Sequence, residues 1–325
     1  MTIEEVSEVI KEARPNIKDN TIRMYATNLN KLRKSFDTEE YKFLTSIDQV
    51  KAKLTEYHYT TQRNYYNSII IFLMAINDKN ELNKVIEEYN ELRDSLNKQY
   101  EDENATGVIS DKQKRNFIKL EEVNKMISEM GEDIRINKLK KKGEISAKEK
   151  QLIMVYILFN IYTRLPMRND VAGMESITKR QYNTLSEEDK KERNYLIVEK
   201  NRMKFVVNQF KTSSKYKELN IDIPKDLEKY LRVWLRINGM GVLFKSTTDK
   251  PLTRNALSQL LIRTSKKYLN KSISTTMLRK IVLSDKFVEV KKEQQEMAEV
   301  TGHSVETMNK IYVKEDQEEN PKEEV

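Results

Sequence analysis

Residues 195–223 read YLIVEKNRMKFVVNQFKTSSKYKELNIDI, and within them apolar side chains recur at a period of two. Three short β-prone runs, at 195–198, 205–210 and 219–223, predict strands. The polar and basic segment KTSSKYK, at 211–217, separates the second run from the third and is typical of a hairpin tip. This stretch therefore predicts a small antiparallel sheet.

Helical patterns flank this sheet on both sides. Apolar residues recur at three- and four-residue steps over residues 120–130 and 148–163 before it, and over 227–237 and 257–269 after it. The sequence therefore predicts a mainly α fold with a small antiparallel β-sheet, in which the sheet belongs to an α+β domain.

The first hundred residues are expected to form a separate helical domain. Their first helical series is Ile22, Tyr25, Leu29, Leu32 and Phe36. Asn20 and Thr21 are capping candidates for that helix, and a second helix is expected over 60–76. The polar segment 101–117, which contains Gly107, has no apolar periodicity and is typical of an interdomain linker.

Composition excludes several classes of site. The 325 residues include no Cys and 2 His, which excludes disulfides, Cys-ligated zinc, iron–sulfur clusters and a thiol nucleophile, and leaves little for an all-His metal site. No apolar run approaches the roughly 18 residues that span a bilayer, and the acidic N-terminus does not resemble a signal peptide. We expect a protein that is not secreted and stays intracellular, in the cytoplasm or nucleus of a host cell.

Charge is unevenly distributed along the chain. Lys and Arg number 59 against 51 Asp and Glu, a net charge of +8, yet the tail 315–325 holds six acids and one Lys, a net of −5. Residues 1–314 therefore carry +13. A folded body this basic favours a polyanionic partner, with nucleic acid ahead of an acidic membrane surface.

A motif near the C-terminus carries the first candidate chemistry. Residues 301–312 read TGHSVETMNKIY, in which Gly302 can end one helix and Ser304 can cap the next. His303 precedes that helix, and Tyr312 follows the histidine by nine residues. The alternative interpretation is a capped helix that packs its tyrosine into a core.

This spacing resembles the tyrosine recombinase (phage integrase) family, whose C-terminal signature is Gly-His-Ser followed by Tyr nine residues after the His. The family's first Arg corresponds to Arg168 in YTRLPMRNDV, with Arg164 a weaker candidate, and its hairpin Lys corresponds to Lys211 in Lys211-Thr212. The local sequence LPMRND looks most like that of divergent recombinases of large DNA viruses and mobile elements.

The family's His-x-x-Arg motif corresponds to residues 276–279, where Thr276 replaces the His and Arg279 is kept. A hydroxyl can donate one hydrogen bond to a phosphate but cannot serve as an imidazole acid or base. The family's acid three residues after its first Arg is also displaced, because Asp170 comes two residues after Arg168.

The resemblance implies a helical core-binding domain at 1–100, the linker at 101–117 and a catalytic domain at 118–314. It implies that Tyr312 is the nucleophile of a 3′-phosphotyrosine intermediate and that Lys211 protonates the departing 5′ oxygen, with Lys215 and Lys217 as rival lysines. The phosphate would be held by four further residues, namely Arg168, Thr276, Arg279 and His303. No cofactor, metal or ATP is required, because the phosphotyrosine keeps the energy of the broken bond.

The implied partner is double-stranded DNA, bound by a homo-tetramer on paired sites that is a monomer or dimer when free. Two other functions fit the same residues: a type IB topoisomerase, which nicks and reseals one strand as a monomer, and a DNA-binding descendant in which Thr276 marks decayed catalysis. A metal-dependent carboxylate nuclease would suit the charge, but no spacing singles out a trio of acids.

Overall fold

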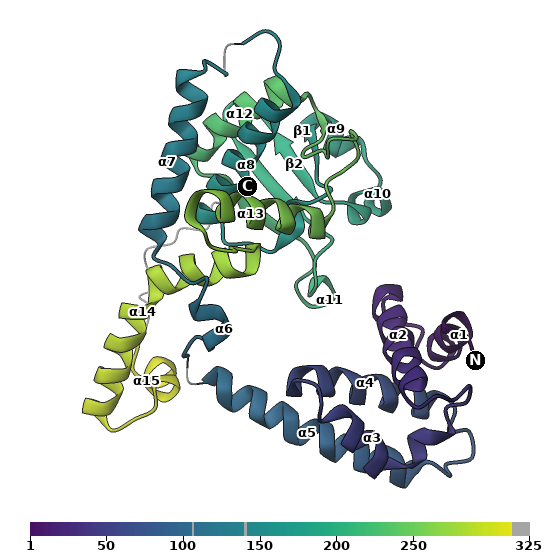
Figure 1. Cartoon of the computed structure of the whole chain (residues 1–325). Helices are drawn as coiled ribbons and strands as arrows, with labels where there is room; N and C mark the ends of the chain where they lie inside the picture. Colours follow the sequence, from purple (N-terminus) through teal and green to yellow (C-terminus); the bar gives the residue numbers. More distant parts are fainter. Residues whose placement is uncertain (106, 140–141, 314–325) are drawn as a thin grey trace. The chain divides into compact units, whose positions relative to one another are not determined.

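The computed structural model describes residues 1–105, 107–139 and 142–313 (Figure 1). The chain divides into two compact units, Met1–Ile109 and Ser110–Val325. The acidic tail expected at 315–325 lies outside the described residues. Within those residues no helix is long and apolar enough to cross a membrane.

The first unit is entirely helical in its described residues. Its elements are α1 (Ile3–Ala13), α2 (Asp19–Ser35), η1 (Lys42–Thr45), α3 (Ile47–Leu54), α4 (Tyr59–Ala75) and α5 (Asn83–Ala105). The apolar run in α4 forms the centre of the core, where Tyr66 and Phe72 are buried. The Tyr89 hydroxyl donates to the Leu44 carbonyl at 2.8 Å, which satisfies the polar end of a buried ring. The N-cap of α2 is Lys18 rather than the expected Asn20 or Thr21.

The segment expected as a linker is partly helical. Residues 101–105 continue α5, and α6 (Asp111–Lys114) adds one further turn. Two contacts hold the end of α5 on α4: the Tyr59 hydroxyl donates to Glu103, and the Arg63 guanidinium lies 4.4 Å from the centre of the Tyr100 ring. These contacts between distant residues stabilise a helix that local polarity does not predict.

The second unit surrounds a buried helix, α8 (Ala147–Arg164), on which four other helices pack. They are α7 (Leu120–Ile136), α12 (Lys225–Asn238), α13 (Arg254–Leu269) and α14 (Thr275–Thr301). Ser146 begins α8 with a capping box to Glu149, and every residue from Ile153 to Thr163 is buried. A helix that is buried on all sides fixes the positions of its neighbours, including the loop that follows it.

The sheet has five strands in the order β4-β3-β2-β1-β5. They are β1 (Glu175–Thr178), β2 (Tyr195–Val198), β3 (Met203–Val207), β4 (Leu219–Asp222) and β5 (Gly241–Val242). β2, β3 and β4 pair antiparallel as expected, but β1 pairs with β2 in parallel. The parallel pairing is possible because α9 (Lys179–Thr184) and α10 (Glu187–Glu192) form a crossover between the two strands. The predicted fold class, mainly α with a small sheet, is confirmed, and the sheet is mixed.

The connection between β3 and β4 is more ordered than a simple turn. Residues Ser213–Tyr216 form the single helical turn α11, and Lys217 after it has a φ of 54°. The left-handed backbone at Lys217 reverses the chain into β4. The hairpin itself is therefore present, with a helical turn at its tip.

Candidate active site

Arg279 is fixed against the loop that follows α8. Ser274 caps the start of α14, and one turn later the Arg279 Nε donates to the Pro166 carbonyl at 2.9 Å and its Nη2 to the Met167 carbonyl at 2.6 Å. Burial and the neighbouring charge of Arg168 lower the pKa of Arg279 from its usual value. An arginine nonetheless stays protonated at any working pH, so Arg279 provides a positive charge in a fixed position.

Arg168 follows Met167 directly, so it belongs to the loop on which the Arg279 side chain is held. Its backbone carbonyl accepts a hydrogen bond from the buried Tyr162 hydroxyl at 3.4 Å, which anchors the main chain. Its side chain is exposed, and among the described residues no acceptor is bonded to it. Arg168 is therefore positioned by its backbone while its five N–H donors remain available for a ligand.

Arg164, the weaker candidate, is already engaged within the fold. Its Nε pairs with Asp226 of α12, and its Nη1 donates to the Asn160 side-chain oxygen at 2.8 Å. A guanidinium held in this way supports packing of α8 on α12, so Arg168 is the better phosphate ligand of the two.

Asp170, the displaced acid two residues after Arg168, pairs with Arg254. The Arg254 Nη2 lies 3.1 Å from the Asp170 Oδ1 and 2.9 Å from the Gln209 carbonyl. Burial raises the pKa of Asp170, although three arginines, Arg254 first, oppose that effect. Arg254 therefore joins the Arg168 loop to the end of β3, and sequence analysis missed it.

Two features of Arg254 explain how the sequence could have indicated it and why it was missed. It is the first residue of α13, where a positive charge opposes the helix dipole, so its position is locally unfavourable. Its partner Asp170 lies far away in the sequence, and no local pattern connects the two. The one available signal for Arg254 was therefore that a basic residue occupies the first turn of a helix.

Asn194 also connects the loop that carries Arg168 to the residues that follow β3. Its side-chain Nδ2 donates to the carbonyls of Asp170 (2.9 Å) and Gln209 (3.2 Å). Its Oδ1 accepts from the backbone N–H groups of Asn208 (2.9 Å) and Gln209 (2.7 Å). This buried amide uses its full hydrogen-bonding capacity, so it fixes the spacing between the Arg168 loop and the hairpin.

Replacing Asn194 with Ala is expected to destabilise the protein without touching the candidate catalytic residues. The backbone N–H groups of Asn208, which is buried, and Gln209, which is partly buried, would lose their acceptor, at about 2–4 kcal/mol in total. For a unit of this size that corresponds to a fall in Tm of roughly 5–15 °C, measured by calorimetry. Asn201→Ala, in an exposed loop, is the matched control. A loss no larger than that of the control would contradict this role.

The raised pKa of Asp170 predicts a particular dependence of stability on pH. Between the ordinary carboxyl pKa near 3.9 and the raised value, the folded state binds a proton that the unfolded chain does not. The contribution of Asp170 to the free energy of unfolding therefore increases as the pH falls through this window. Asp170→Asn lacks this contribution. Urea titrations of both proteins at pH 7 and near pH 4 should show wild type gaining stability relative to the variant, and equal changes would contradict the prediction.

Lys211 lies close in the sequence to Gln209, whose carbonyl accepts a hydrogen bond from Arg254. It is exposed and comes two residues after Gln209, a separation of at most about 7 Å of backbone. Lys215, the rival lysine, has its ammonium 5.3 Å from the centre of the Tyr216 ring, and Lys217 is exposed after α11. Lys211 is therefore the hairpin lysine nearest in sequence to the Arg254 contact.

Thr276 lies in the first turn of α14 with its side chain exposed. It precedes Arg279 by three residues, a spacing that places two side chains on the same helical face. The threonine hydroxyl and the Arg279 guanidinium therefore border the same surface.

His303 and Tyr312 form a pair of their own. The Tyr312 hydroxyl and the His303 Nε2 are 3.2 Å apart, and the two rings stack with centres separated by 5.2 Å. Gly302 ends α14 with a φ of 69°, and Ser304 caps α15 (Val305–Ile311) as predicted. Tyr312 is 60% exposed, so the alternative in which it packs into a core is wrong.

The structure does not bring this pair to the arginines of the same chain. α14 runs without interruption from Thr275 to Thr301, so its axis measures about 33 Å between Arg279 and Thr301. Figure 1 shows α15 folded back beside the last turns of α14, at the end of that helix away from α8. The predicted site is therefore two clusters: Arg168, Thr276 and Arg279 with the Lys211 hairpin nearby, and His303 with Tyr312.

No protein-family model matches the chain, and none of the curated proteins searched matches it. Two solved recombinases resemble it. The crystal structure of XerA recombinase is 12% identical, with a TM-score of 0.33, over 97% of this chain and 94% of that chain. XerH site-specific recombinase bound to difH substrate, a pre-cleavage complex, is 15% identical, with a TM-score of 0.47, over 97% of this chain and 85% of that chain. Identity at this level concerns the overall fold only.

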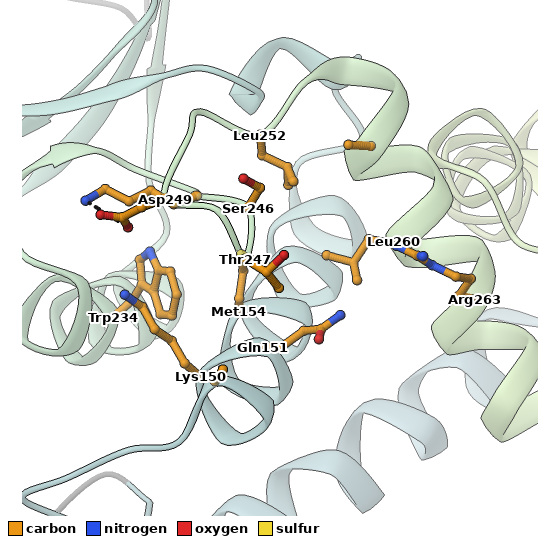
Figure 2. Close-up of a pocket in the computed structure, with 13 residues that line it drawn as sticks. Lys150, Gln151, Met154, Trp234, Ser246, Thr247, Asp249, Leu252, Leu260 and Arg263 are labelled. Carbon is orange, nitrogen blue, oxygen red and sulfur yellow. Dashed lines mark ion pairs between the residues drawn. The ribbon is translucent and has the colours of Figure 1, made fainter.

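A separate cavity of about 270 Å³ lies between α8, α12 and α13 (Figure 2). Lys150, Lys245 and Arg263 give its wall a basic character, and the Lys150 ammonium lies 6.0 Å from the Trp234 ring centre. None of the candidate catalytic residues lines it. Across the described ranges no cluster of three or more His, Asp or Glu side chains could hold a metal ion.

Proposed function

We propose that this protein is a site-specific DNA recombinase that cleaves and rejoins DNA through a 3′-phosphotyrosine intermediate. The observation that carries the proposal is that two guanidiniums meet at one loop: Arg279 of α14 is held against the Pro166 and Met167 carbonyls, and the exposed Arg168 side chain of that loop has no bonded acceptor among the described residues. Two guanidinium forks can bind the non-bridging oxygens of one phosphate bidentately.

The nucleophile is the Tyr312 phenol. Its Oη attacks the scissile phosphorus, the Tyr312 Oη–P bond forms, and the bond from phosphorus to the 5′ oxygen breaks. Arg168 and Arg279 stabilise the additional negative charge of the pentacovalent transition state, and Thr276 can donate one hydrogen bond to it. Rejoining is the reverse reaction with a 5′-hydroxyl as the nucleophile.

Two protons move in each transfer. The phenol proton passes to the His303 Nε2, which already lies 3.2 Å from the Tyr312 hydroxyl. The departing 5′ oxygen takes a proton from Lys211, whose place after β3 brings it near the arginine loop. Because Thr276 cannot take part in proton transfer, these two residues supply both functions.

Double-stranded DNA is the expected substrate, and the net charge of +13 over residues 1–314 supplies the attraction. Phosphotyrosine formation conserves the energy of the phosphodiester bond, so the reaction needs neither ATP nor a metal ion. Binding should weaken steeply as salt concentration rises, because each phosphate contact releases counterions.

The decisive test is covalent trapping. A duplex is first selected from a randomised pool by its binding to the full chain, then nicked near the bound position and incubated with the protein in EDTA. The expected product is an SDS-resistant protein–DNA adduct that protease removes. Tight binding without any adduct would favour the non-catalytic alternative, in which reversion of Thr276 to His is the first variant to examine.

The topoisomerase alternative is disfavoured by one observation. A monomer that nicks and reseals DNA must hold its nucleophile and its phosphate-binding arginines in one chain, whereas α14 separates Tyr312 from Arg279 by its length. Strand exchange between two duplexes, compared with relaxation of a supercoiled plasmid, distinguishes the two activities.

A further inference from the structure

The crossover between β1 and β2, residues 179–194, covers the face of the sheet that α8 does not. Along β2 and β3, alternate apolar side chains point away from the core around α8 and form a second, smaller cluster. Its buried members are Tyr195, Ile197 and Val206, and Tyr182 of the crossover packs against them. Figure 1 shows α9 and α10 on this side of the sheet, which is therefore covered on both faces.

The crossover holds the residues that lead into Lys211. The Asn208 Nδ2 donates to two backbone carbonyls of the crossover, at 2.7 and 3.0 Å, and the Gln209 Nε2 donates to a third, that of Lys191, at 2.6 Å. Phe210, the next residue, is buried in the core around α8. The chain is thus fixed to both layers up to the residue before the candidate proton donor.

The crossover also holds the chain where the hairpin returns to the sheet. The Tyr182 hydroxyl donates to the Glu218 Oε2 at 3.1 Å, one residue before β4 begins. The Tyr182 ring packs edge-on against Tyr195, with ring centres 5.5 Å apart, which fixes the position of the hydroxyl. Burial and the adjacent Glu218 charge raise the pKa of Tyr182 to about 12, so the phenol keeps its proton and continues to donate at neutral pH.

Residues 211–217 lie between these two attachments. Lys211 is exposed, and among the described residues no acceptor is bonded to its ammonium. The turn closes on itself through backbone bonds, such as that from the Tyr216 N–H to the Thr212 carbonyl at 3.1 Å. Because a lysine side chain is a flexible stem, the position of its backbone decides which region the ammonium can reach. The two attachments therefore limit that region.

We propose that the crossover positions Lys211 for proton transfer, and that Gln209 and Tyr182 are positioning residues of the proposed reaction. In that step the Lys211 ammonium gives one proton to the 5′ oxygen as its bond to phosphorus breaks. The neutral amine takes a proton back when the 5′-hydroxyl attacks during rejoining. Gln209 and Tyr182 act through Lys211 rather than on the phosphate. This inference rests on the proposed function, and it gives a role to a segment without any candidate catalytic residue.

The nicked duplex of the trapping assay, made with sulfur in place of the bridging 5′ oxygen, tests this inference. A thiol has a pKa of about 8.5, so a thiolate leaves without a proton, whereas an alkoxide leaves poorly unless it is protonated. A variant that impairs only proton donation should therefore react slowly with the oxygen duplex and normally with the sulfur duplex. Lys211→Ala is the reference for this pattern and should be slowed on the oxygen duplex by about 10²-fold or more.

Gln209→Ala and Tyr182→Phe should each slow adduct formation on the oxygen duplex by roughly tenfold or more, because a small displacement of a catalytic group lowers the rate steeply. The sulfur duplex should remove this difference from wild type. The matched controls are Gln259→Ala, an exposed substitution in α13, and Tyr216→Phe at the hairpin tip. Both controls should react as wild type does with each duplex.

If either variant is slowed equally on the two duplexes, or on neither, its residue does not act through Lys211 and the inference is overturned. If wild type forms no adduct with either duplex, the proposed function fails, and this inference fails with it. Adding Gln209→Ala to Lys211→Ala should cause no further loss on the oxygen duplex, because no lysine is left to position. A further loss as large as that of Gln209→Ala alone would give Gln209 a separate role and contradict the inference.

Discussion

Replacing Tyr312 with Phe is expected to abolish the covalent protein–DNA adduct while leaving DNA affinity unchanged. In the proposed reaction the phenol oxygen is the atom that bonds to phosphorus, and a phenyl ring offers no substitute nucleophile. The Tyr312 side chain is 60% exposed, and within the described part of the chain its hydroxyl bonds to His303 alone, so its loss should not disturb the fold. The measurement is adduct yield after SDS denaturation, together with binding at fixed salt.

Tyr216 provides a stringent control for this experiment. It is 56% exposed and lies in α11 on the hairpin that carries Lys211, so it is the tyrosine to examine first if Tyr312 is not the nucleophile. Tyr216→Phe should retain full adduct formation. An adduct that survived in Tyr312→Phe and disappeared in Tyr216→Phe would reassign the nucleophile.

Replacing Arg168 with Ala is expected to slow adduct formation by on the order of 10²–10³ with little change in stability. In the proposed reaction the guanidinium stabilises charge in the transition state, yet it is exposed and no described residue accepts a hydrogen bond from it, so we expect folding not to depend on it. The free energy of unfolding should stay within about 0.5 kcal/mol of wild type. Single-turnover rates and urea titration measure the two quantities.

Arg279→Ala should behave differently, and the contrast tests the geometry. Its side chain bonds to the Pro166 and Met167 carbonyls, so the substitution should lower the rate and also destabilise the loop. Arg180→Ala, an exposed substitution in α9, is the matched control for a lost positive charge. If Arg168→Ala were no slower than Arg180→Ala, Arg168 would not contact the phosphate.

The elements that sequence analysis predicted best are those with strong local signals. β2 has the predicted bounds, 195–198, and α8 differs from the predicted 148–163 by one residue at each end. The two strands it missed, β1 and β5, are four and two residues long. β2 is also four residues long, but all four are apolar, whereas β1 (ESIT) and β5 (GV) each contain a single large apolar residue. Neighbouring strands rather than their own sequence stabilise such strands.

Motif spacing predicted the order of the candidate site residues but not the distances between them. Arg168 and Arg279 come together because α14 packs on α8, a contact that apolar periodicity in both helices allows. No spacing could reveal that α14 continues to Thr301, since Gly302 ends the helix only there. The separation of Tyr312 from the arginines therefore became visible only in the structure.

The pairing of Arg254 with Asp170 shows a second limit. Sequence analysis noted that Asp170 stands one position nearer to Arg168 than in the family that the motifs resemble, but the partner of Asp170 belongs to a helix that begins 84 residues later. Contacts of this kind depend on tertiary packing of α13 against η2 (Asn169–Val171), which no single-sequence pattern encodes.

The uninterrupted length of α14 also bears on the timing of the proposed reaction. The candidate nucleophile and the candidate phosphate ligands lie at opposite ends of this helix, so a duplex that reaches the arginines does not thereby meet Tyr312. Occupation of the duplex and its breakage would then be separate events, and the covalent product would lag behind the bound complex.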